Sequence, residues 1–322
     1  SADSGATFTQ ISPHPHADHQ DIDVNGTDIW IATDGGLDLS TDELQTFQSR
    51  KYGITGSEYW RIGSGWNEDI IVGGRYHNGD AALFMPNYGL GQSLFLGAAE
   101  QGTGYVYPLN NRQAYFSDLG SSPVIPTTLT GAVEYLPQLN LFPNEGYTLR
   151  RSELVFDCRY AAVLYLGKDN QFWKSTDGGV NFTAMHSFGN STTKVMEIEQ
   201  SRSNPLVIYC SVYNDANGSS TKGEIYKSID GGSSWTKTTD LPASYRRELQ
   251  LSINPENAND LWVGNTYGSN GQKVYQTTDG GSSWQNRTTS TLDGEQMRDM
   301  LYQPAVSNDL IYVATYYGVF SV

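Results

Sequence analysis

The sequence contains few cysteines, few basic residues and no long apolar run. Its two cysteines, Cys158 and Cys210, do not occupy matching positions in the repeats described below, so we expect buried free thiols rather than a disulfide. The 20 lysine and arginine residues face 35 acidic ones, and the net charge of −15 argues against a nucleic-acid partner, because phosphate binding needs a basic face. No apolar stretch approaches the roughly 20 residues that span a bilayer, so no direct insertion into a membrane is expected.

Runs with the periodicity of an amphipathic helix are also missing. The chain has instead 34 glycines, 21 tyrosines and 7 tryptophans, and only 17% of its residues are charged. This composition is typical of an all-β protein rich in turns, of the kind that is secreted or displayed at a cell surface. No motif requires a cofactor, and none is expected.

One eight-residue pattern recurs along the chain: Ser or Thr, any residue, Asp, any residue, Gly, two residues of any kind, and an aromatic. Its copies span residues 1–8, 40–47, 175–182, 228–235 and 277–284, and the second copy has lost its glycine. The Asp can accept hydrogen bonds from backbone amides, the Gly supplies a positive φ, and the aromatic covers the turn as the next strand begins. The pattern therefore predicts hairpin turns whose aspartates are structural and not metal ligands: Asp3, Asp42, Asp177, Asp230 and Asp279.

These turns resemble the Asp-box, or BNR repeat, of the β-propellers found in sialidases, sortilin-type domains and xyloglucanases. The resemblance implies a β-propeller in which the box is a structural turn away from any active centre. Residues 14–80 are also similar in pattern to propeller modules of large exported surface proteins of Bacteroidetes-type bacteria, with His16, Asp18 and His19 before a strand that ends at Asp34. This second likeness, and an opening inside a motif, lead us to expect a piece or module of a longer exported protein.

The strand pattern has the period of a propeller blade. Residues 194–237 contain four apolar or alternating segments around one box, and residues 249–288 repeat their order, which predicts four-stranded antiparallel blades about every 45 to 50 residues. Between the second and third boxes the pattern is weaker. There we expect Ile70 to Gly74 and Gly104 to Tyr107 to be second strands, and Ala114 to Asp118 to be a third strand and turn.

Counting such units gives the architecture. One blade is expected over residues 16–50 and three over 57–188. The last blade would be composite, because the strands within residues 293–322 lack a box and a fourth strand that residues 1–12 can supply, and this closes the ring. The sequence thus predicts a single all-β domain over residues 1–322, a seven-bladed β-propeller, with six or eight blades as alternatives.

The densest polar cluster is a candidate metal site. His16, Asp18 and His19 carry the imidazole and carboxylate groups that bind Zn²⁺. The alternative is a first strand that enters a central channel, where these side chains bond to neighbouring backbone. Residues of a strand alternate between its faces, so His16 and Asp18 can share a face that His19 reaches only if the strand bends.

Two carboxylates, Asp34 and Asp157, are the candidate catalytic residues if the chain is a glycoside hydrolase of the sialidase or xyloglucanase type. In the alternative interpretation, each caps a turn. Aromatic residues near the expected strand ends suit either a binding surface or packing between blades: Tyr59, Trp60, Trp66, Tyr213, Tyr267, Tyr316 and Tyr317.

These patterns favour a recognition or adhesion module without enzymatic activity. Its expected partner is a glycan or a protein at the cell surface, and it would adjoin other domains of the same longer chain. The hydrolase is one alternative. The other is a structural spacer that lends a large surface protein a rigid bead.

Overall fold

The computed structural model describes residues 4–8, 10, 16, 18–50, 59–75, 78–85, 87–97, 104–108, 112–116, 119, 121–137, 154–214, 222–304 and 310–321. Within these ranges the regular structure is all strand apart from one 3₁₀ turn, η1 (Ser290–Leu292), as the composition predicts. None of the described residues belongs to a helix with the length and apolar character needed to cross a membrane. The chain divides into two compact units, Ser1–Leu139 and Asn140–Val322, and each is described by itself.

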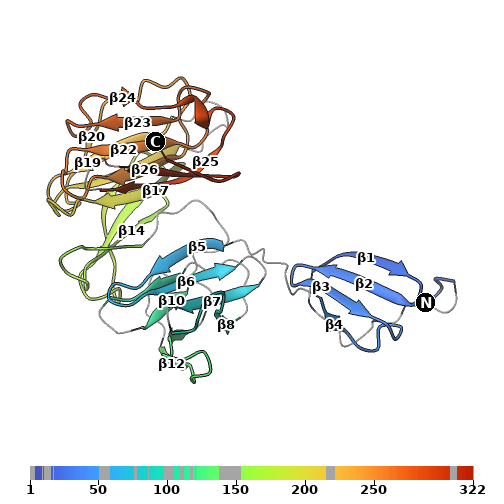
Figure 1. Ribbon diagram of the computed structural model, residues 1–322. Helices are drawn as coiled ribbons and strands as arrows, with labels where there is room; N and C mark the ends of the chain where they lie inside the picture. Colours follow the sequence, from blue (N-terminus) through green and yellow to red (C-terminus); the bar gives the residue numbers. More distant parts are fainter. Residues whose placement is uncertain are drawn as a thin grey trace. The chain divides into compact units, whose positions relative to one another are not determined.

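The first unit contains two four-stranded sheets whose strands follow chain order (Figure 1). The first sheet consists of β1 (His19–Asn25), β2 (Asp28–Thr33), β3 (Gly36–Ser40) and β4 (Gln48–Ser49). The second consists of β5 (Tyr59–Ser64), β6 (Ile70–Arg75), β7 (Gly79–Phe84) and β8 (Leu94–Gly97). All neighbouring strands in both sheets are antiparallel.

The described residues of this unit also form two shorter ladders. They are formed by β9 (Gly104–Val106) with β10 (Ala114–Phe116), and by β11 (Ser121–Val124) with β12 (Glu134–Pro137). An antiparallel bridge between Gln113 and Val124 joins the two ladders into the order β9, β10, β11, β12. The expected second strand at Ile70 is confirmed as β6, between β5 and β7, and strands are found at Gly104 and Ala114 as β9 and β10, which pair with each other. The predicted turn at Ser117 and Asp118 lies outside the described residues, so the places of β9 and β10 within a blade stay predictions.

The second unit contains three four-stranded sheets and one three-stranded sheet among its described residues (Figure 1). The first two are β13 (Val155–Phe156), β14 (Leu164–Lys168), β15 (Gln171–Ser175) and β16 (Thr183–Ser187), then β17 (Thr193–Gln200), β18 (Ile208–Asn214), β19 (Glu224–Ser228) and β20 (Thr236–Lys237). The others are β21 (Leu249–Ile253), β22 (Leu261–Asn265), β23 (Val274–Thr277) and β24 (Gln285–Asn286), then β25 (Met297–Gln303), β26 (Leu310–Thr315) and β27 (Val319–Ser321).

Apolar clusters join several of the successive sheets within each unit. In the first unit, Val72 and Phe84 share a buried cluster with Val106 and Phe116 from the next sheet. In the second unit, Tyr209 packs in one cluster with residues of β21 to β23 such as Leu251, Val263 and Tyr275. Each fully buried side chain of this kind contributes about 1.5 to 3 kcal/mol of transfer free energy. These clusters hold the sheet of β5 to β8 against β9 and β10, and the sheet of β17 to β20 against the sheet of β21 to β24.

The repeated turn has one hydrogen-bond network in its described copies. In the copy at Ser228, Oγ donates to Asp230 Oδ1 (2.8 Å) and accepts the amide of Gly232 (2.9 Å). Asp230 in turn accepts the amide (2.8 Å) and the hydroxyl (2.5 Å) of Ser234. The copies that begin at Ser40, Ser175 and Thr277 repeat this network around Asp42, Asp177 and Asp279. The bonds from Ser234 and Ser228 hold the pKa of Asp230 at about 2.

The predicted composite blade joins residues of both units. The last sheet has the three strands that the sequence predicts over residues 297–322. Asp3 and most of residues 9–12, which would supply the missing turn and outer strand, lie outside the described residues. Ring closure and the blade count therefore stay predictions.

Candidate functional site

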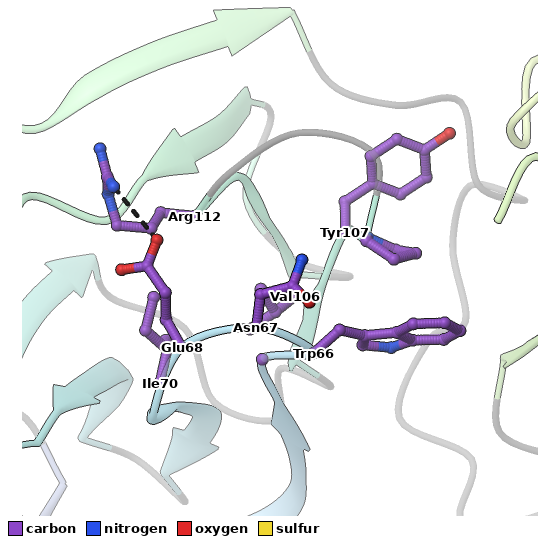
Figure 2. Close-up of a pocket in the computed structure, with 9 residues that line it drawn as sticks. Trp66, Asn67, Glu68, Ile70, Val106, Tyr107 and Arg112 are labelled. Carbon is purple, nitrogen blue, oxygen red and sulfur yellow. Dashed lines mark hydrogen bonds and ion pairs between the residues drawn. The ribbon is translucent and has the colours of Figure 1, made fainter.

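A surface pocket lies between the β5–β6 hairpin and the β9–β10 hairpin of the first unit. Its empty volume, including the open mouth, is about 280 Å³, and its lining comprises Gly65, Trp66, Asn67, Glu68, Ile70, Val106, Tyr107, Pro108 and Arg112. Figure 2 shows the rings of Trp66 and Tyr107 toward one side, the side chains of Glu68 and Arg112 toward the other, and Asn67 between them. Trp66 is 52% exposed, whereas Tyr107 is buried.

Glycine at position 65 lets the β5–β6 hairpin turn tightly. The amide of Gly65 donates to the carbonyl of Ile70 (2.8 Å), and the amide of Ile70 donates to the carbonyl of Glu68 (2.8 Å). A Cβ atom at position 65 would lie 2.5 Å from the Glu68 carbonyl oxygen, closer than Cβ atoms approach in real proteins. The turn therefore requires glycine here, and it presents Trp66 and Asn67 to solvent.

Arg112 fixes the opposite wall of the pocket. Its backbone has a φ of +61°, in the left-handed region that costs a residue with a side chain free energy. Its guanidinium donates to the carbonyl of Ile125 through Nε (2.9 Å) and to Glu68 Oε1 through Nη1 (3.3 Å). The guanidinium thus ties two hairpins together and neutralises Glu68 at the pocket surface.

The pocket therefore combines an exposed indole with a fixed set of donors and acceptors. Arg112 has five N–H donors and uses only part of them on Ile125 and Glu68, while the carboxylate of Glu68 and the amide of Asn67 add acceptors. The lining therefore offers aromatic surface on one side and hydrogen-bonding groups on the other.

The predicted aromatic residues occupy different environments. Tyr59 begins β5 and is 38% exposed, and Trp60 lies in β5 with its side chain outside the described residues. Tyr316 and Tyr317 follow β26 and are exposed. Tyr213 is fully buried, so its ring is not itself a surface platform.

Arginines organise the tyrosines of the second unit. The guanidinium of Arg247 lies 5.7 Å from the ring centroid of Tyr213 and 5.2 Å from that of Tyr267, which brings these two predicted residues together. Arg298 lies over the ring of Tyr316 at 4.0 Å. Cation–π contacts of this kind stabilise the connections between strands, and Glu248 at 3.6 Å from Arg247 already supplies a counter-charge.

Asp157 caps a turn and is 1% exposed. It accepts hydrogen bonds from the Tyr165 hydroxyl (2.9 Å) and the Gln200 amide (2.7 Å) as well as from the backbone amides of Arg159 (2.9 Å) and Tyr160 (3.1 Å). Burial raises the pKa of Asp157, but the bonds from Gln200, Arg159, Tyr165 and Tyr160 outweigh burial and hold that pKa below its usual value. A catalytic acid needs the opposite, a raised pKa and access to the substrate.

Asp34 also connects parts of the backbone. Its Oδ1 accepts the side-chain amide of Gln20 (2.7 Å), and its carbonyl accepts the side-chain amide of Asn78 (2.8 Å). Its own amide donates to the carbonyl of Asp18 (3.3 Å). The contact with Asn78 joins the loop after β2 to the loop after β6.

The candidate metal cluster does not converge. His19 Nε2 lies 2.7 Å from the carbonyl of His16, and Asp18 between them has a φ of +55°. The ring of His16 packs on Gly35, where a Cβ atom would approach His16 Cδ2 to 2.5 Å. Over the described residues, no group of three or more His, Cys, Asp or Glu side chains is placed to hold a metal ion. The three residues therefore do not form such a group.

Of the pocket residues, sequence reasoning identified Trp66 and missed Glu68, Tyr107 and Arg112. Arg112 follows Glu68 by 44 residues and meets it only because two hairpins without the repeated turn pack together. The pairing has no local sequence signal. The sequence also gives no sign that the backbone of Arg112 has a positive φ.

No protein-family model matches the sequence, and no curated protein matches it. Among solved structures, the chain is similar to YCF48 bound to D1 peptide, with 14% identity over 92% of this chain and 89% of that one and a TM-score of 0.53. It is also similar to the extracellular domain of the putative one component system BT4673 from B. thetaiotaomicron, with 12% identity over 94% of this chain and 38% of that one and a TM-score of 0.53. A third similar structure is an ancestral GH74 enzyme, with 15% identity over 97% of this chain and 37% of that one and a TM-score of 0.50. The chain thus spans little more than a third of the length of the last two.

At these identities the likeness shows the fold alone. These neighbours are β-propellers, so the predicted all-β propeller is confirmed at the level of fold.

Proposed function

We propose that this chain is a recognition propeller, a binding module without enzymatic activity that belongs to a secreted or cell-surface protein. The observation that carries the proposal is the pocket of Figure 2, whose lining combines the half-exposed side chain of Trp66 with the polar groups of Asn67, Glu68 and Arg112. An aromatic surface with a few oriented donors and acceptors is the composition of a recognition site. A glycan or a protein segment is its proposed partner.

The candidate carboxylates support binding over hydrolysis. Glycoside hydrolysis by the common mechanism needs two carboxyl groups that flank the scissile bond. Asp157 is instead buried beneath four protein donors, and Asp34 is engaged by Gln20. These contacts support a structural role for both side chains.

Two structural neighbours also support recognition as the kind of function. YCF48 was solved with a peptide bound, and the BT4673 neighbour is an extracellular domain. Both are properties of those proteins. For this chain they favour an exported propeller that binds other molecules.

The proposal includes a specific architecture, an Asp-box propeller of the sialidase, sortilin and xyloglucanase-like superfamily. The eight sheets of the described residues reduce to seven blades if β9 to β12 form one blade, as the bridge between Gln113 and Val124 indicates. In this proposal residues 1–12 complete the last blade and close the ring over a single domain. The chain would be one module of a longer protein.

The test is a binding screen on a glycan array and a peptide library, run beside turnover assays on sialyl and β-glucan substrates. We expect binding that Trp66→Ala weakens, and no turnover. Turnover that disappears in Asp34→Asn or Asp157→Asn, with an unchanged circular dichroism spectrum, would make the chain a glycoside hydrolase and refute the proposal. Silence in both assays would favour the spacer.

A further inference from the structure

The sequence contains Asn-Gly pairs at Asn25–Gly26, Asn78–Gly79, Asn217–Gly218 and Asn270–Gly271. Asparagine is among the residues that degrade chemically in proteins, and a following glycine has no Cβ atom to shield its amide nitrogen from the Asn side chain. Asn217 and Gly218 lie outside the described residues. The other pairs differ in how their reacting groups are bound, and this difference separates them chemically.

Asn270–Gly271 is bound by the connection that leads to β25. The amide of Gly271, which is the group that would attack the Asn side chain, donates to Asp293 Oδ1 (2.9 Å). Asn270 Oδ1 accepts the amide of Gly294 (2.9 Å). Both reacting groups are therefore engaged, although Asn270 and Gly271 are exposed.

The side chain of Asn78 is engaged as well. Its Nδ2 donates to the carbonyl of Asp34 (2.8 Å). Gly79 pairs with Arg75 at the start of β7, and the carbonyl of Gly97 lies against the position that a Cβ atom would take. A reaction here has to break the bond to Asp34 and move packed backbone.

Asn25–Gly26 lacks these restraints. The pair lies at the β1–β2 turn, where Asn25 pairs with Asp28 and Gly26 has a φ of +67°, close to the +71° of Gly271. Both residues are exposed, and nothing lies within 4 Å of the position of a Cβ atom on Gly26. Within the described parts of the chain, neither the Asn25 side chain nor the Gly26 amide makes a hydrogen bond.

We propose that Asn25 is a site of spontaneous modification, at which the side-chain amide becomes a carboxylate through a cyclic imide. The Gly26 amide nitrogen, once it has lost its proton to hydroxide, attacks Cγ of Asn25, and the Asn nitrogen takes up a proton and leaves as ammonia. Water then opens the imide at either carbonyl, which gives aspartate or isoaspartate at this position. The proposal is independent of the recognition function.

The product should weaken the turn. Position 25 lies opposite Asp28 in the β1–β2 register, so a carboxylate there places like charges opposite each other. An isoaspartate also adds a methylene group to the backbone, which breaks the alternation of side chains along β1. The modification therefore acts on the first hairpin of the first sheet.

The test is peptide mapping of the whole chain by mass spectrometry after storage at mildly alkaline pH in water labelled with a heavy oxygen isotope. The water that opens the imide leaves its oxygen in the product, so the label marks conversion during storage. We expect Asn25 to convert at least about tenfold faster than Asn78 and Asn270, which corresponds to about 1.4 kcal/mol of activation free energy. The peptide that contains Asn217 is scored separately.

Two controls separate the fold from the local sequence. In the urea-unfolded chain, Asn25, Asn78 and Asn270 should convert at similar rates, because their restraints are lost. Asp293→Ala frees the Gly271 amide, so it should speed conversion at Asn270 and leave Asn25 unchanged. Equal rates in the folded protein would overturn the proposal. An Asn25 that stays as far ahead in urea, or an Asn270 that Asp293→Ala does not speed, would overturn the explanation from hydrogen bonds.

Discussion

Replacing Glu43 by glycine should stabilise the protein. In the copies of the repeated turn that begin at Ser175, Ser228 and Thr277, the two positions after the aspartate hold glycines such as Gly231 and Gly232, with φ values of +71° and +89°. The copy at Ser40 has Glu43 and Leu44 there, and they adopt the same left-handed conformation, with φ values of +60° and +68°. The intact hydrogen bonds around Asp42 hold this backbone in place.

The magnitude follows from two opposing terms. A residue with a side chain loses roughly 1 to 2 kcal/mol in the left-handed region, and a glycine costs about 0.5 to 1 kcal/mol through the greater freedom of the unfolded chain. Glu43 is exposed, so no burial is lost on its replacement. We therefore expect Glu43→Gly to raise the free energy of unfolding by about 0.5 to 1 kcal/mol, or the melting temperature by about 1 °C. Glu43→Gln removes only the charge and should change little.

The intact turn provides the mirror experiment. A Cβ atom at Gly231 would have only an ordinary contact, 3.6 Å to Leu206 Cδ2, so Gly231→Ala should lower stability by backbone strain alone, about 0.5 to 1 kcal/mol. At Gly232 the atom would lie 2.3 Å from Phe172 Cε1 in the neighbouring sheet, so Gly232→Ala should cost more. The measurement is the urea midpoint of each variant. A less stable Glu43→Gly, or a Gly231→Ala as stable as the wild type, would refute this reasoning.

Three further predictions concern buried and titrating groups. Because the Ser234 hydroxyl is the main cause of the lowered pKa of Asp230, Ser234→Ala should move the NMR titration midpoint of Asp230 up from about 2 toward 3.8. The lowered pKa stabilises the fold above pH 3.8 and this contribution is lost as the pH falls toward 2, so the stability difference between wild type and variant should shrink over that window. Asp157→Asn should lower the free energy of unfolding by about 2 to 3 kcal/mol, because the new NH₂ group would lie against N–H and O–H donors that now bond to the carboxylate. Equal stability of variant and wild type in urea would contradict this. Cys210 is buried and Cys158 half-buried, both free, so a thiol reagent should label only Cys158 until the protein unfolds, as mass spectrometry can check.

The sequence predicted the strands best where the repeated turn marks the end of a hairpin. Leu249 to Ile253 is predicted and found as β21, and the strand predicted from Glu224 to Lys227 becomes β19 with one added residue. Without a turn motif, between residues 50 and 175, the strands at Gly104 and Ala114 are found, but the described residues give them only as a short two-stranded ladder. Apolar alternation identifies a strand, but only turn chemistry fixes its place in the order.

The candidate site was less predictable, because it depends on contacts between distant residues. Trp66 and Tyr213 were both predicted as binding residues because they lie near expected strand ends. In the structure Trp66 is half exposed, whereas Tyr213 is fully buried. The difference arises from Arg247, which lies against the Tyr213 ring from a connection more than 30 residues away along the chain. Asp157 was selected as a carboxylate in a turn, and only its four donors show that it is a structural cap.

The pocket lies where the chain departs from its own repeat. In the second unit, polar side chains form hydrogen bonds within the hairpins that connect first and second strands. The backbone amide of Asn204 donates to Ser201 Oγ (3.1 Å), and the side-chain amide of Asn254 donates to Asp260 Oδ2 (3.0 Å). The corresponding hairpin after β5 instead holds Trp66, whose side chain is half exposed and lines the pocket. Features that local rules do not explain concentrate at functional sites. The same reasoning applies to Arg112, a left-handed residue whose side chain reaches the neighbouring hairpin, and both departures meet in one pocket.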